Sequence, residues 1–292
     1  MVETVSPASD TLSQRAMAAL GKLPPFSPIL NKLLASLAGE DVSFAKLGDL
    51  IEKDTVVAGN IMHLVNSALY ARRATITSVR HALAILGMDK VRNTLLGMSI
   101  SRMWSQLKTP PAWSMSHFNR HSASVAILSD QMAARLPAEY PEGAFVAGLL
   151  HDLGRLLIAL GLPEEFARLL KLHEQSGRPW TDCEMELLGC THAELSANAL
   201  AVWKFPEQVQ IAVRDHHRPP AFPPGGSLPL SAIVDAANRY VNSTGESILA
   251  RSSAPGSEDP APIAALGLPE EKLDKLLADF RVEHQALLGY FK

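Results

Sequence analysis

Several histidines stand at spacings that would bring imidazole rings together. His117 and His121 are four residues apart, so a helix would carry both on one face. That face continues through Val125, Leu128 and Met132, which predicts that both imidazoles point into the protein. Inward-facing neutral imidazoles are suitable ligands for zinc, iron, manganese or nickel.

A histidine and an aspartate stand side by side in an apolar stretch. The sequence GLLHDLGRLL, residues 148–157, predicts one buried helix that carries His151 and Asp152 among leucines. A buried carboxylate is costly unless a partner replaces the water that it loses. We therefore expect the pair to have a partner inside the protein.

More candidates follow along the chain. His192 is expected on the first turn of its helix, because the sequence THAE has the spacing of a capping box. His216 and His217 end the next helix, and Asp235 lies in the apolar stretch LSAIVDAANRY. No cysteine stands at these points, which argues against a structural thiolate site.

One metal centre would explain all of these groups, with one or two ions of iron, manganese, zinc or nickel. Asp152 would bridge two adjacent ions. The candidate ligands are His117, His121, His151, Asp152, His192, His216, His217 and Asp235. The alternative is a buried hydrogen-bonded network that only fixes helix packing. The remaining histidines are interpreted as ordinary core or surface residues: His63, His81, His173 and His284.

The composition is typical of a folded protein whose net charge does not attract strongly charged partners. Of the 292 residues, 47% are hydrophobic, and the net charge of −3 provides no basic field for nucleic acid or anionic membrane. We expect no stretch approaching the roughly 18 apolar residues of a membrane span. Cys183 and Cys190 form no CxxC motif and favour a reducing compartment, so the expected location is cytoplasmic.

Helical periodicity dominates the chain and predicts an all-α fold. Residues 1–15 are expected to be a flexible terminus, and residues 16–106 a helical subdomain. The sequence LKTPPAW, residues 107–113, interrupts helix twice and marks a boundary. A second helical subdomain follows over residues 112–242, and residues 243–292 are expected to be a linker and a C-terminal helix.

The order of these motifs resembles the HD superfamily of metal-dependent phosphohydrolases. The wider context resembles its HDOD branch, a bacterial signalling domain, over roughly residues 16–242. The matching segments include LPPFSPILNKLLASL, ITSVRHALAILGMDKVRNTLLGMS, GLLHDLGRLLI and ELLGCTHAELSANALAVWKFPEQVQIAVRDHH. The resemblance implies an N-terminal helical subdomain packed on an HD-type helical subdomain.

The resemblance also bears on activity. It implies that His121, the His151–Asp152 pair, the later histidines and Asp235 are metal ligands. In the related HD-GYP phosphodiesterases a glutamate stands where His117 stands here, and a lysine where Arg155 stands. The GYP loop is absent, and RPPAFPPGGS takes its place.

Two functions follow from this resemblance. The first is a regulatory module that acts through contacts with signalling proteins, with a retained His/Asp metal site. The second is a metal-dependent phosphohydrolase in which Asp152 helps hold the metal and Arg155 binds phosphate or nucleotide. No membrane and no clear nucleic-acid partner is expected from either.

Overall fold

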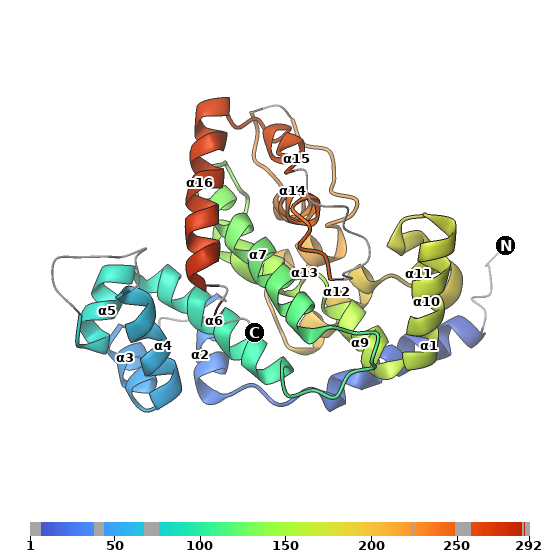
Figure 1. Cartoon of the computed structure of the whole chain (residues 1–292), viewed down its shortest axis with the longest axis horizontal. Helices are drawn as coiled ribbons and strands as arrows, with labels where there is room; N and C mark the ends of the chain where they lie inside the picture. The colour runs from blue at the N-terminus through green and yellow to red at the C-terminus, as the bar shows by residue number, and fades with distance from the viewer. Residues whose placement is uncertain are drawn as a thin grey trace.

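The regular secondary structure of this computed structural model is helical, which confirms the predicted all-α fold (Figure 1). The structure describes residues 7–37, 44–66, 76–223, 225–248, 258–287 and 289. No β-strand occurs within these ranges, where the only β pairing is an isolated bridge between Ala138 and Leu228.

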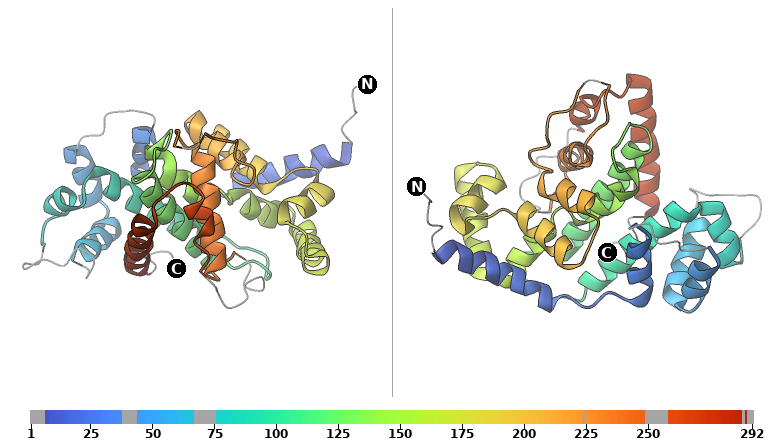
Figure 2. Two further views of the ribbon diagram at one scale, coloured as in Figure 1. Left: turned by 90° about the horizontal axis from the view of Figure 1, so that it is seen from above. Right: turned by 180° about the vertical axis from the view of Figure 1, so that it is seen from behind.

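The N-terminal group of helices lies at one end of an elongated molecule (Figure 1, Figure 2). Its members are α2 (Pro28–Leu37), α3 (Phe44–Glu52), α4 (Thr55–Val65), α5 (Val79–Leu86) and α6 (Met88–Trp104). Local sequence sets some of their starts, because Asp54 accepts hydrogen bonds from the backbone N–H groups of Val56 and Val57 and thereby caps α4. The long helix α6 leads from this group into the centre of the protein (Figure 1).

The second group of helices surrounds the buried α7 and α8. Its members are α7 (Met115–Ala133), α8 (Ala144–Leu150), α9 (Leu153–Gly161), α10 (Pro163–Ser176), α11 (Trp180–Leu188), α12 (His192–Val202), α13 (Glu207–Arg214) and α14 (Leu230–Ser243). Helix α7 packs along α8 and α14, while α12 packs on α9 and α13. The two groups share one hydrophobic core.

Both ends of the chain pack on this second group. Helix α1 (Pro7–Ala18) covers part of residues 1–15, which were expected to be flexible, and it contacts α9 and α12. Near the other end, α15 (Ala261–Ala264) contacts α14, and α16 (Glu270–Leu287) lies along α7 (Figure 1). Residues 1–6 and 249–257, on which the expected terminus and linker partly fall, lie outside the described residues.

The predicted single helix over residues 148–157 is wrong in one important detail. Helix α8 ends at Leu150 and α9 begins at Leu153, so His151 and Asp152 form the break between them. The backbone of Asp152, at φ −102° and ψ 12°, leaves the helical conformation. Leucines on both sides hide this break in the sequence.

Close helix packing around the break requires glycine. A Cβ on Gly148 would lie 2.8 Å from the Cα of Ala126 in α7. A Cβ on Gly154 would lie 2.0 Å from the carbonyl oxygen of His192 in α12. These two glycines therefore let α7 and α12 approach the break from both sides.

The same region is unusually apolar. The stretch Pro141–Gly161 is long and apolar enough to cross a membrane, so the prediction that no such stretch exists is wrong. However, 94% of its most apolar window is buried inside the protein. Its hydrophobic length is thus accounted for by its position in the core.

Candidate metal centre

Ends and faces of several helices meet at one buried point. Helix α7 contributes one residue, the α8–α9 break contributes two, the start of α12 contributes one, and the turn after α13 contributes two. These residues are His121, His151, Asp152, His192, His216 and His217. All are buried except His217, which is half-buried.

The carboxylate of Asp152 lies in the middle of this cluster. Its Oδ2 is 3.3 Å from Nε2 of His151 and 3.7 Å from Nε2 of His121. Its Oδ1 is 2.9 Å from Nε2 of His192 and 4.0 Å from Nε2 of His216. Ligands at about 2.0–2.1 Å from one ion lie roughly 3 to 3.5 Å from each other. The distances from Asp152 to His151 and His192 fit this spacing, and those to His121 and His216 are slightly longer. The two oxygens face two groups of imidazoles, as a bridging carboxylate would.

Hydrogen bonds fix the orientation of three imidazoles. In each ring Nδ1 lies 2.6–2.8 Å from a backbone carbonyl oxygen, and the pairs are His121 with Glu246, His151 with Gly148, and His216 with Val213. A carbonyl only accepts, so each Nδ1 carries the proton and each Nε2 keeps a free lone pair. Those three Nε2 atoms are buried and have no hydrogen-bond partner. Such orphaned acceptors, all aimed at one point, are what a metal ion would satisfy.

A buried carboxylate orients the fourth imidazole. Glu184 of α11 is 1% exposed, and its Oε2 lies 2.7 Å from Nδ1 and 2.9 Å from the backbone nitrogen of His192. On the other side of that ring, Nε2 of His192 lies 2.9 Å from Nε2 of His217. Carboxylate, imidazole and metal commonly stand in this order in metal sites.

The electrostatics of the cluster favour the metal-binding protonation states of His121, His217 and Asp152, whereas the pKa of His192 shifts in the opposite direction. Burial lowers the pKa of His121 to about 4 and that of His217 to about 2, so both rings are neutral at pH 7. Burial opposes ionisation of Asp152, but Arg155 and the nearby imidazoles outweigh it and hold its pKa well below the usual range. For His192, burial is outweighed by the carboxylates of Glu184 and Asp152, which raise its pKa.

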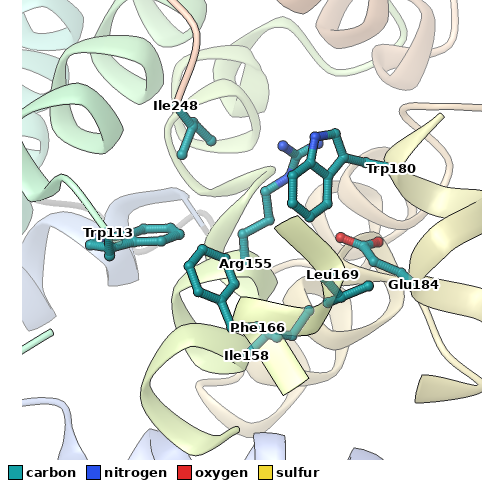
Figure 3. Close-up of a pocket in the computed structure, with 8 residues that line it drawn as sticks. All are labelled: Trp113, Arg155, Ile158, Phe166, Leu169, Trp180, Glu184 and Ile248. Carbon is teal, nitrogen blue, oxygen red and sulfur yellow. The ribbon is translucent and has the colours of Figure 1, made fainter. Parts of the chain in front are cut away.

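A small cavity adjoins the cluster on the side of Arg155 (Figure 3). The Arg155 guanidinium lies over the ring of Trp180, 5.5 Å from its centroid, while its Nε is 3.2 Å from Oδ1 of Asp152. Trp113 and Ile248 line the same cavity. The space open to the centre of a water molecule there is small, about 10 Å³.

Two predicted ligands are not brought to the cluster. His117 lies one turn before His121 but is half-buried and belongs to neither group of converging side chains. Asp235 lies on the side of α14 that meets α15, where its carboxylate is 3.6 Å from Arg239. Burial raises the pKa of Asp235, and no imidazole of the cluster is among its contacts in the described residues. Neither residue therefore belongs to the cluster that the structure brings together.

Comparison with known proteins places this arrangement in a family. The model of the HDOD domain matches residues 23–219. The chain belongs to the HDOD family. Among solved structures, it is similar to an HDOD domain protein from Geobacter sulfurreducens, with a TM-score of 0.71, 23% identity, and coverage of 95% of this chain and 98% of the other.

Two further similarities extend the comparison. A candidate phosphohydrolase from Shewanella amazonensis has a TM-score of 0.68 and 22% identity, with 95% of this chain and 98% of the other covered. An uncharacterised protein of Treponema pallidum is 22% identical over 221 residues, which are 75% of this chain. The match spans only 42% of that relative's length. At these identities the solved structures show a shared fold.

Residues that the sequence patterns do not single out also build the centre. Sequence spacing does not single out Glu184, because a glutamate in a charged helix resembles a surface residue. Glu246 lies beyond residue 219, and it reaches His121 through its backbone carbonyl, for which no residue type gives a signal. His284 is likewise not an isolated histidine, since its Nε2 is 3.0 Å from Oε2 of Glu246.

Proposed function

We propose that this HDOD chain is a regulatory module that acts through protein contacts and retains a metal centre at its core. The observation that carries the proposal is the set of buried Nε2 atoms without hydrogen-bond partners, all facing the Asp152 carboxylate. A network built only for helix packing would leave few such atoms unsatisfied, because each costs free energy when buried. The donor set of imidazoles and one carboxylate suits iron, manganese, zinc or nickel.

In this proposal the ion is held by His121, His151, Asp152, His192, His216 and His217. It would supply positive charge among groups drawn from four separate helical segments. Glu184 and the backbone carbonyls keep the rings oriented, while Arg155 balances part of the carboxylate charge. Binding to the folded chain alone would stabilise that packing by mass action.

The size of the cavity beside the centre favours a module over an enzyme. The cavity beside Arg155 leaves about 10 Å³ for the centre of a water-sized group, which is far less than a typical ligand pocket provides. Trp113, Trp180 and Ile248 enclose this space (Figure 3). A structurally similar protein from Marinobacter aquaeolei, with a TM-score of 0.69 and 21% identity over 97% of this chain and 66% of the other, is named as a candidate signal-transduction protein.

The alternative is a metal-dependent phosphohydrolase. The observation that favours it is the position of Arg155, whose guanidinium borders both the cavity and Asp152. In that case Arg155 would bind a phosphate oxygen, and Asp152 would help to hold the ions that activate water. This alternative requires the wall formed by Trp113, Trp180 and Ile248 to open.

A turnover assay separates the two functions. Protein reconstituted with each of the four metals would be incubated with p-nitrophenyl phosphate, nucleotides and cyclic dinucleotides, beside Asp152→Ala as the control. The module predicts no hydrolysis above that of the variant. Metal-dependent turnover that disappears in Asp152→Ala would overturn it in favour of the phosphohydrolase.

A further inference from the structure

The C-terminal helix α16 contacts two parts of the molecule through neighbouring residues. His284 contacts α7 and Glu246: its Nε2 lies 2.8 Å from Oγ of Ser124 and 3.0 Å from Oε2 of Glu246. The adjacent Glu283 forms an ion pair with Lys90 of α6. Gln131 of α7 donates a hydrogen bond to the same Glu283 carboxylate at 2.9 Å.

Glu246 connects this helix to a candidate metal ligand. Its carboxylate is held by Arg120 at 2.7 Å and by Ser124 at 2.6 Å, both from α7, in addition to His284. Its backbone carbonyl accepts the Nδ1 proton of His121 at 2.7 Å. Because three side chains fix the position of Glu246, they also fix the acceptor that orients the imidazole.

These contacts form a chain from His121 in the metal centre, through α16, to helix α6, and a change at one end can affect the other. At one end, the orientation of His121 depends on Glu246 and, through it, on the docking of α16. At the other end, Glu283 joins α16 to α6, which belongs to the N-terminal group of helices (Figure 1). If docked α16 favours metal binding, bound metal must favour docked α16 by the same factor.

We propose that Glu246 and His284 are positioning residues that couple the metal centre to α16 and, through Glu283 and Lys90, to the N-terminal helices. The coupling makes α16 the element through which metal occupancy is sensed elsewhere in the protein. This inference rests on the proposed regulatory function. Glu246, Glu283 and His284 lie beyond the HDOD match, whereas their partners His121 and Lys90 lie within it.

The first test measures the orientation of His121 in the metal-free full chain. Nitrogen-15 NMR of the histidine rings should show His121 with its proton on Nδ1 in the wild type. Glu246→Ala removes the side-chain contacts that hold the carbonyl, so the Nδ1–H form should lose its predominance. Glu258→Ala is the matched control, because it breaks a different ion pair of α16, the one between Glu258 and Arg281, and leaves the contacts of Glu246 in place. An unchanged His121 tautomer in Glu246→Ala would overturn the positioning role.

The second test measures the coupling itself. Metal affinity, from competition with a chromogenic chelator, should fall about 10-fold or more in Glu246→Ala and in His284→Ala. The double variant should lose no more than the single ones, because both act through one contact. Hydrogen exchange should show that metal protects α16 in the wild type and in Glu258→Ala, but not in Glu246→Ala.

The outcomes distinguish this inference from the proposed function. A wild type that takes up no metal contradicts the proposed function, while the NMR measurement still decides whether Glu246 positions His121. A wild type that binds metal with equal affinity in all variants, and without protection of α16, overturns the coupling and leaves the metal centre intact. Melting temperatures of the metal-free variants identify any that fail to fold.

Discussion

The carboxylate of Glu184 holds both the backbone and the ring of His192. It lies 2.9 Å from the backbone nitrogen and 2.7 Å from Nδ1, so one buried acidic group contacts both the backbone and the side chain of the first residue of α12. Glu184 belongs to α11, so this contact also joins two successive helices across the Gly189 turn. Nε2 of His192 is thereby directed toward Asp152.

Replacing this carboxylate should weaken the metal centre. Glu184→Gln keeps the size of the side chain but removes the negative charge that raises the pKa of His192. We expect metal affinity to fall by about 10- to 100-fold and the pKa of His192 to decrease. Chelator competition and NMR titration measure the two effects. Glu186 lies on the same helix as Glu184, and its exposed carboxylate pairs with Arg178. Glu186→Gln should therefore change neither the metal affinity nor the pKa of His192.

A methyl group at residue 154 should displace the start of α12. In Gly154→Ala the new Cβ would meet the His192 carbonyl oxygen at 2.0 Å, so the backbone must move. We expect a loss of about 1–3 kcal/mol in the free energy of unfolding, together with weaker metal binding. Gly59→Ala in α4 is the control, because its Cβ meets no atom within 4 Å and alanine favours helix. Equal stability of the two variants in urea unfolding would refute the close packing at residue 154.

The acidic residue Asp130 should make stability depend on pH. Burial raises the pKa of Asp130 from 3.8 to about 6, although Asn93 donates a hydrogen bond to it at 2.8 Å. The raised pKa therefore adds fully to the free energy of unfolding below pH 3.8, and this contribution is lost as the pH rises through 6. The reason is that the unfolded chain releases the proton at a lower pH than the folded chain does.

Asp130→Asn removes this titration. Relative to the wild type, its free energy of unfolding should rise between pH 4 and 7 by up to about 3 kcal/mol, since each pKa unit corresponds to about 1.4 kcal/mol. Urea unfolding across this range measures the difference. Asp279→Asn, at a half-exposed carboxylate paired with Arg135, should show no such rise. A constant difference between Asp130→Asn and the wild type would contradict the raised pKa.

Local patterns in the sequence predict most of the cluster but not its geometry. Helical spacing predicts that His121 faces inward, and the capping-box sequence predicts His192 at the start of α12, as observed. The break at His151 and Asp152 is not predictable from hydrophobicity, because leucines continue through it. It arises where α7 and α12 pack closely on either side, which is a tertiary constraint.

The position of Asp235 shows a second limit of what the sequence can predict. Its apolar neighbours indicate burial, but the face of α14 that it occupies depends on where α15 packs. Its motif position alone therefore gives the wrong expectation for its surroundings. The C-terminal contacts of Glu246 are similarly hidden, since a backbone carbonyl can belong to any residue.

The most direct test of the metal centre is elemental analysis of the untagged protein. The wild type should hold one or two equivalents of iron, manganese, zinc or nickel, and its removal by chelation should lower the melting temperature. Asp152→Ala should lose the metal, whereas Asp235→Ala, the same chemical change outside the cluster, should retain it. A fully folded wild type that takes up none of these metals on reconstitution would contradict the account, as would an Asp152→Ala variant with undiminished metal content.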